Sequence, residues 1–160
     1  MVGQAPKIRR SGPLYTPEQR RRRDGTFWTL VQAILAPVQF AVFAVSLVLV
    51  LRYLATGEGL WWATLSILVK TGCLYLIMVT GAIWEKVVFG QYLLAPAFFW
   101  EDVFSFGVIA LHTAYLWAFF SGMSPEVQMW IALAAYGAYV INAVQFLLKL
   151  RMARLEGAPA

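Results

Sequence analysis

Apolar residues fill four long stretches of the chain, which are separated by short polar turns and preceded by a polar segment. The stretches cover residues 27–54, 60–88, 98–120 and 125–152. Each is longer than the roughly 20 residues that an α-helix needs to cross a bilayer. The pattern lacks the alternation and the even, turn-separated segments of a membrane barrel. It therefore predicts an all-α integral membrane protein, a four-helix bundle whose transmembrane domain spans residues 26–153.

Polar residues gather at the two ends of the chain. Residues 1–25 form a basic N-terminal segment, and residues 154–160 form a C-terminal tail. In the first segment, Thr16, Pro17 and Gln19 suit the N-cap, first and third positions of a helix with a capping box. Arg20–Arg23 follow directly. We expect a short juxtamembrane helix whose arginines lie at phospholipid headgroups.

The distribution of charge predicts the orientation in the membrane. The chain is 61% hydrophobic and 13% charged, with a net charge of +5. With four spans, most basic residues near the helix ends fall on one side, namely Arg20–Arg23, Lys86, Lys149, Arg151 and Arg154. The opposite turns carry Glu58 and Glu126, with Arg52 as the nearby base. The positive-inside rule then places both termini in the cytoplasm. Basic flanks of this kind indicate a lipid partner, and no nucleic-acid partner is expected.

The connection between the second and third stretches is unusually apolar. Residues 90–97 read Gly-Gln-Tyr-Leu-Leu-Ala-Pro-Ala. We expect this loop to lie in the membrane interface. Glu85 precedes it and Glu101-Asp102 follow it, so acidic residues flank the loop on both sides at the cytoplasmic face.

Ionisable groups inside membrane helices are costly and are functional candidates by default. The candidate catalytic residues are Glu85, Glu101, Asp102 and His112. Residues spaced by three and four share a helix face. The third stretch carries such a stripe, made of Glu101, Ser105, Val108, His112 and Tyr115. The other stripes consist of Thr71, Tyr75, Met78, Ala82 and Glu85; of Asn142, Gln145 and Lys149; and of Gln32 and Gln39.

Helix depth suggests which of these groups meet. Adjacent antiparallel helices would gather six of them in one cavity of the cytoplasmic half, namely Gln32, Glu85, Glu101, Asp102, Asn142 and Gln145. His112 lies deeper, about 16 Å beyond Glu101 at 1.5 Å per residue. Lys70 reaches a similar depth.

Each candidate also has a purely structural explanation. Glu85 and Glu101 could be interfacial carboxylates paired with Lys86 or with the N-terminal arginines. Asp102 could be a first-turn acid that the helix dipole favours. His112 could form a hydrogen bond across the bundle, and the amide side chains could join neighbouring helices.

Several enzyme classes are excluded by composition. The chain has one histidine and one cysteine, Cys73, so it cannot build a multi-histidine oxidase or desaturase centre or a bis-histidine di-haem site. A Walker A sequence, a dinucleotide fingerprint, CxxC, HExxH and a nucleophile elbow are all absent from the sequence.

Six stretches of the chain resemble one known family. They are LYTPEQRRRRD (14–24), WTLVQAILAPVQF (28–40), LRYLATGEG (51–59), IWEKVVFGQYLLAPAFFWEDVF (83–104), LHTAYL (111–116) and YVINAVQFLLKLRMARLE (139–156). Together they are similar to the 3-vinyl bacteriochlorophyllide hydratase family of phototrophic bacteria. The resemblance covers residues 14–156 without an evident gap.

The resemblance implies an activity. The family adds water across the C3-vinyl group of chlorophyllide a or 3-vinyl bacteriochlorophyllide a, giving a 3-(1-hydroxyethyl) group. It implies no redox or organic cofactor and no bound metal, because the magnesium belongs to the substrate. It also implies a place in the cell inner membrane or the intracytoplasmic photosynthetic membrane, among other enzymes of bacteriochlorophyll biosynthesis.

The candidate residues suit this chemistry. Hydration of a vinyl group needs a neutral acid, a positioned water and a base, and two carboxyl groups in different environments can divide the first and last roles. Glu101 could share these roles with Glu85 or Asp102, and His112 could transfer protons or ligate the substrate magnesium. The residues expected to bind substrate are Gln32, Gln39, Tyr75, Trp84, Trp100, Ser105, Asn142 and Gln145.

Two other interpretations stay open at this stage. A non-catalytic tetrapyrrole-binding or assembly protein would need a magnesium ligand such as His112 but not a pair of acids. A proton- or ion-coupled membrane protein would need polar residues along a continuous path, and the outer half of this bundle has few of them.

Overall fold

The computed structural model describes residues 12–157, which fold into five helices. They are α1 (Pro17–Gly25), α2 (Phe27–Thr56), α3 (Leu60–Phe89), α4 (Phe99–Phe120) and α5 (Pro125–Gly157). The last four are each long and apolar enough to cross a membrane. The prediction of an all-α protein with four membrane spans is confirmed, and α1 is the expected short N-terminal helix.

The start of α1 follows the predicted capping box. The Thr16 hydroxyl accepts a hydrogen bond from the Gln19 backbone N–H at 3.2 Å, and the Gln19 side chain accepts from the Thr16 N–H at 2.9 Å. Pro17 occupies the first turn, where a missing N–H costs nothing. Thr26 then caps α2, so the chain turns directly from the juxtamembrane helix into the first span.

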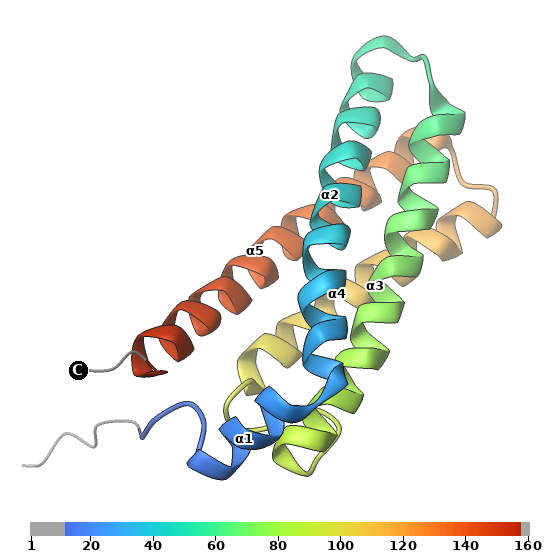
Figure 1. The fold of residues 1–160 in the computed structure, drawn as a ribbon. Helices are drawn as coiled ribbons and strands as arrows, with labels where there is room; N and C mark the ends of the chain where they lie inside the picture. The colour runs from blue at the N-terminus through green and yellow to red at the C-terminus, as the bar shows by residue number, and fades with distance from the viewer. Residues whose placement is uncertain (1–11, 158–160) are drawn as a thin grey trace, which may run out of the picture.

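The four long helices form two hairpins that cross each other (Figure 1). α2 packs along α3, and α4 packs along α5, while α1 lies against α3. The α2–α3 turn contains Gly57 and Gly59 with φ values of 73° and 83°, which favour glycine. α1, the α3–α4 connection and the C-terminal end of α5 lie at the same end of the bundle (Figure 1). This topology brings most of the basic residues to one end, whereas Arg52 lies near the α2–α3 turn at the other, and the cytoplasmic location of the basic end stays a prediction.

The fifth helix is longer than the predicted span. It continues to Gly157, whereas the apolar stretch ends at residue 152 and a tail was expected from 154. Arg151–Glu156 are mostly good helix formers, so the helix extends beyond the apolar stretch. The extra turn carries Glu156 back over the N-terminal segment, where its carboxylate accepts a hydrogen bond from the Leu14 N–H at 2.8 Å.

The surface of the long helices is apolar, as a lipid-facing surface must be. Exposed large side chains include Val48, Leu65, Phe120 and Leu147. The interior, by contrast, holds buried polar and charged groups as well as apolar ones. This distribution is the reverse of that in a soluble protein, and the buried polar groups are therefore the candidates for a functional site.

Candidate functional site

Glu85 and Asp102 form a buried carboxyl pair at the α3–α4 turn. Glu85 lies in the last turn of α3 and is 4% exposed, and Asp102 lies in the first turn of α4 and is 3% exposed. Their carboxyl groups lie side by side and interact directly. The structure therefore unites two of the predicted catalytic residues.

The apolar loop between α3 and α4 closes over this pair with its backbone. The Leu94 N–H donates to Asp102 Oδ2 at 2.7 Å, and the Ala95 N–H donates to Glu85 Oε2 at 3.3 Å. Leu94 adopts a φ of 60°, which is uncommon for a residue with a side chain. Such conformations persist where the surroundings impose them and cluster at functional sites. The loop expected in the membrane interface thus binds both acids.

Glu101 lies beside the pair but has a different environment. It is 5% exposed, and its Oε1 lies 3.7 Å from Lys149 Nζ on α5. Its Oε2 is buried and has no hydrogen-bond partner among residues 12–157. Lys86, one of the partners considered for Glu101, instead donates to the Gly90 carbonyl at 2.8 Å. Glu101 is therefore an ion-paired carboxylate with one free oxygen.

Asn142 and Ser105 hold α5 against α4 at the level of Glu101. Asn142 Nδ2 donates to the Glu101 backbone carbonyl at 2.9 Å, and Asn142 Oδ1 accepts from Ser105 Oγ at 3.0 Å. Gln145 Oε1 accepts a longer bond, 3.4 Å, from Asn142 Nδ2. These side chains lie at the site, and their hydrogen bonds join the helices that position Glu101.

Several predicted site residues lie away from the carboxyl pair or contact other groups. Gln32 donates to Thr80 on α3 at 2.7 Å, and its place in the expected cavity stays a prediction. Trp100 is 65% exposed. Tyr75 forms a hydrogen bond with Thr113 at 2.6 Å, and Trp84 Nε1 donates to Thr29 at 2.9 Å.

The predicted stripe on α4 is confirmed, because all five of its side chains are buried. It nevertheless serves two separate polar clusters. His112 lies eleven residues beyond Glu101 and is fully buried, with its ring 5.9 Å from the Tyr136 ring. His112 thus lies deeper along α4 than Glu101, as its spacing predicts, and its catalytic role stays a prediction.

The second cluster surrounds Lys70 in the middle of the bundle. Lys70 is fully buried, with Nζ 3.6 Å from the Tyr139 ring centroid. The Gln39 amide, oriented to satisfy both neighbours, accepts from Lys70 at 3.2 Å and donates to the Cys73 carbonyl at 3.2 Å. His112 Nδ1 forms a hydrogen bond with the Val108 carbonyl at 2.8 Å. Nε2 then carries a lone pair, which has no hydrogen-bond partner in the described chain.

An aromatic cluster, called the aromatic roof below, forms where the segment before α1 meets α3, the α3–α4 connection and α5; it consists of Tyr15, Trp84, Phe89, Phe98 and Phe146. Tyr15 stacks on Phe89 with ring centroids 5.7 Å apart, and Phe98 stacks on Phe146 at 6.0 Å. Burial raises the pKa of the Tyr15 hydroxyl, although Arg23, whose guanidinium lies 4.7 Å from the ring, opposes the shift. Tyr15 is not among the site residues predicted from the sequence; its signal is an aromatic residue directly before an N-cap, the position of a hydrophobic staple.

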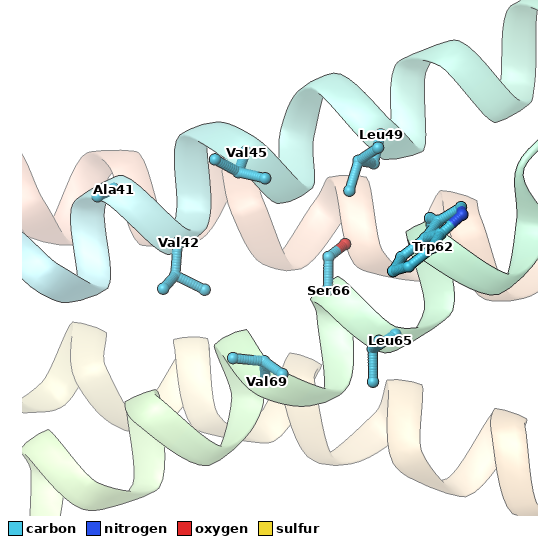
Figure 2. Close-up of a pocket in the computed structure, with 8 residues that line it drawn as sticks. All are labelled: Ala41, Val42, Val45, Leu49, Trp62, Leu65, Ser66 and Val69. Atoms are coloured by element: carbon cyan, nitrogen blue, oxygen red, sulfur yellow. The ribbon is translucent and has the colours of Figure 1, made fainter.

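The structure also has an apolar groove, which is distinct from the carboxyl cluster. It measures about 370 Å³ and lies between α2 and α3 (Figure 2). Its lining residues are Ala41, Val42, Val45, Leu49, Trp62, Leu65, Ser66 and Val69. None of these side chains is an acid or a base that works near neutral pH.

Fold and site together define an integral membrane protein of four spans with a buried carboxyl cluster at one end of the bundle. The sequence profile of the 2-vinyl bacteriochlorophyllide hydratase family matches residues 15–152, and the chain belongs to this family. The chain is therefore a hydratase, a hydro-lyase.

Two relatives carry the same name. The 2-vinyl bacteriochlorophyllide hydratase of Rhodobacter capsulatus is 75% identical over 145 residues, which cover 91% of this chain and 85% of the relative. That of Cereibacter sphaeroides is 78% identical over 143 residues, which cover 89% of each chain. No solved structure matches the fold significantly. The family resemblance seen in the sequence is confirmed.

Proposed function

We propose that this chain adds water to the C3-vinyl group of chlorophyllide a or 3-vinyl bacteriochlorophyllide a and forms the 3-(1-hydroxyethyl) product. The carbon that the family name numbers 2 is C3 in current tetrapyrrole numbering. The names of the relatives support the substrate class. The observation that carries the mechanism is the buried Glu85–Asp102 pair beside the ion-paired Glu101.

The Glu85–Asp102 pair is the acid of the proposed reaction. Two carboxyl groups in direct contact, buried away from water, strongly disfavour a state in which both are ionised. They therefore share one proton. The loop N–H groups of Leu94 and Ala95 bind one oxygen of each carboxyl group and leave the shared proton available for transfer.

The reaction divides into two proton transfers with water addition between them. The shared proton moves to the terminal vinyl carbon, whose π electrons form the new C–H bond, and the inner carbon becomes a cation that the macrocycle delocalises. A water oxygen adds to this carbon. The surplus water proton then passes to Glu101, whose Oε2 is the free acceptor. The sum is one water added, with hydrogen on the outer carbon and hydroxyl on the inner one.

The site must recover its starting protonation state before the next turnover. Glu101 and Asp102 are neighbours in the first turn of α4, and their charges influence each other. A proton can return from Glu101 to the Glu85–Asp102 pair through this contact or through one water. No step in this cycle requires a redox or organic cofactor, and the magnesium stays in the substrate.

The aromatic roof suggests how a flat substrate is held. Trp84 of this cluster directly precedes Glu85 in the chain and Phe98 comes shortly before Asp102, and a chlorin can stack on such rings. The proposed location is the cell inner membrane or the intracytoplasmic photosynthetic membrane, with both termini in the cytoplasm. Other enzymes of bacteriochlorophyll biosynthesis would be its neighbours there.

One experiment tests the proposal directly. Membranes from a host without the pathway, expressing this chain, are supplied with chlorophyllide a in one reaction and 3-vinyl bacteriochlorophyllide a in another. We expect a product heavier by one water, with a red absorption band shifted to the blue. Membranes with the Glu85→Gln and Asp102→Asn double variant serve as the matched control. If folded wild-type protein converted neither pigment, the proposed function would be contradicted.

The same experiment separates an enzyme from a pigment carrier. A carrier would bind the pigment unchanged, with a ligand on the magnesium. His112, the one histidine, is fully buried between helices and so does not favour this alternative. Stoichiometric binding without conversion would support it.

A further inference from the structure

We infer that Lys149 on α5 is a positioning residue for the hydration, and that its ammonium group holds the Glu101 carboxylate through Oε1 so that Oε2 stays free to act as the base. This inference rests on the proposed function, because it assigns the means by which Glu101 serves as the base. Lys149 belongs to the polar stripe of α5 that also contains Asn142 and Gln145.

The geometry of Lys149 fixes both its ammonium group and the carboxylate. Nζ lies 3.7 Å from Glu101 Oε1 and donates to the Ala97 carbonyl at 2.7 Å. It also lies 5.9 Å from the Phe98 ring centroid. The ammonium group therefore contacts both the loop before α4 and the Glu101 carboxylate in the first turn of α4. Its contact with Oε1 orients the Glu101 side chain and leaves Oε2 free.

The charges around Glu101 give Lys149 its importance. Asp102 directly follows Glu101 on α4 and is close enough to feel its charge, and Glu85 on α3 interacts with Asp102. From α5, Lys149 favours ionisation at a distance where burial weakens solvent screening. On α1, Arg23 contacts Asp24 and the Tyr15 ring instead. Among the described residues, Lys149 is the cation that forms a salt bridge with Glu101.

This arrangement produces the asymmetry that the reaction needs. Three carboxyl groups lie within one turn of α4 and the adjoining end of α3, and equal environments would give them equal affinity for protons. A cation beside one of them makes that one the base and leaves the proton on the other two. Without Lys149, Glu101 would compete for the same proton and the free acceptor would be lost.

A purely structural role for Lys149 makes different predictions. Its bond to the Ala97 carbonyl could simply anchor the loop, in which case substitution would lower stability and affect all steps alike. A role in binding the substrate propionate would raise KM and leave kcat unchanged. The positioning role requires a lower kcat, a nearly constant KM and a changed pH profile.

The test compares Lys149→Met, Lys149→Arg, Glu101→Gln and the Lys149→Met/Glu101→Gln double variant, with hydration rates measured across pH in membranes. We expect Lys149→Met to lower kcat by about 10- to 100-fold with KM within about threefold, and to move the acid limb of the pH–rate profile to higher pH. Lys149→Arg should recover most of the rate. The double variant should be no slower than Glu101→Gln, because the lysine acts through this carboxylate.

The controls separate the possible failures. Arg151→Met removes a nearby cation of α5 and should leave the rate and the pH profile unchanged. A wild-type protein without hydratase activity contradicts the proposed function. An active wild type with a Lys149→Met variant of unchanged kcat and pH profile overturns the role of Lys149 alone. Additive losses in the double variant, accompanied by a lower melting temperature, show a structural role and overturn it equally.

Discussion

The backbone N–H of Leu94 donates a hydrogen bond of 2.7 Å to Asp102 Oδ2 from a residue whose φ is 60°. The α3–α4 loop therefore accepts an unfavourable backbone conformation at a leucine, and this conformation turns consecutive N–H groups toward Asp102 and Glu85. This geometry connects the strain in the loop with the protonation state of the acid pair.

Substitutions at Leu94 test this connection. Leu94→Gly removes the cost of the positive φ, about 1 kcal/mol, and keeps the N–H, so we expect an active protein of equal or slightly higher stability. Leu94→Pro removes the N–H and forbids the positive φ. It should lower the hydration rate at least about tenfold, since the bond to Asp102 is lost and the loop must refold. Rates and thermal unfolding in detergent measure both effects, and a Leu94→Pro protein with full activity would contradict the role of the loop.

The carboxyl cluster should dominate the kinetics. We expect Glu85→Gln, Asp102→Asn and Glu101→Gln each to lower kcat by about 100-fold or more with a small change in KM, because each removes a proton donor or acceptor. Residues that act as one unit give non-additive losses. The Glu85→Gln/Asp102→Asn double variant should therefore be little slower than the worse single variant.

Two acids at the other end of the bundle provide the control for these variants. Glu58→Gln changes a carboxyl group in the α2–α3 turn, and Glu126→Gln changes one in the first turn of α5, both far along the chain from the cluster. They should keep wild-type kcat within about twofold. Full activity in all three cluster variants would show that the chemistry takes place elsewhere.

The sequence predicted which helix faces carry the site residues better than it predicted the contacts between those residues. Helical spacing placed Glu101, Ser105 and His112 on one buried face of α4, and the structure agrees. Spacing cannot say which neighbouring helix each side chain meets, because that depends on how the two hairpins cross. Gln32 and Gln39 share a face of α2, and the fold brings both to α3, one to Thr80 and the other to Lys70.

The hydrogen bonds from the loop backbone could not be predicted from the sequence, for a different reason. Its apolar composition suggested contact with the membrane interface, but composition carries no information on where main-chain N–H groups point. The pairing of Glu101 with Lys149 was equally hidden, because it joins residues 48 apart on helices whose relative rotation no local pattern fixes. The stripe of α5 showed that Lys149 faces inward with Asn142, and only the fold shows the partner.

Asn142 should act through the placement of Glu101. Its two hydrogen bonds, at 2.9 and 3.0 Å, join α5 to the Glu101 carbonyl and to Ser105. Asn142→Leu keeps the volume but leaves these groups without partners, so we expect a loss of about 1–3 kcal/mol in the free energy of unfolding and a lower kcat. Gln145→Leu removes the 3.4 Å contact and should cost less than half as much. Thermal unfolding of both variants measures the difference, and equal losses would contradict the assignment.

Tyr15 should contribute to substrate binding through its ring. It is 3% exposed and stacked on Phe89, and its segment is joined to α5 by the bond from the Leu14 N–H to Glu156. Tyr15→Phe keeps the stacking and should behave as the wild type. Tyr15→Ala opens the aromatic roof, so we expect KM to rise several-fold with a smaller effect on kcat. Steady-state kinetics with chlorophyllide a measure this, and a Tyr15→Ala protein with unchanged KM would remove the roof from the binding site.

His112 should be a structural residue of the Lys70 cluster and not a member of the acid–base centre. It is fully buried, with Nδ1 held by the Val108 carbonyl and its ring beside Tyr136. His112→Ala leaves a cavity next to Lys70, so we expect a loss of about 2–4 kcal/mol in the free energy of unfolding. In the protein that stays folded, kcat should fall less than about threefold and the pH–rate profile should keep its shape. His112→Gln, which can retain a polar contact, separates loss of volume from loss of the lone pair. A change in the absorption spectrum of bound chlorophyllide in both variants would instead identify His112 as the ligand of the substrate magnesium.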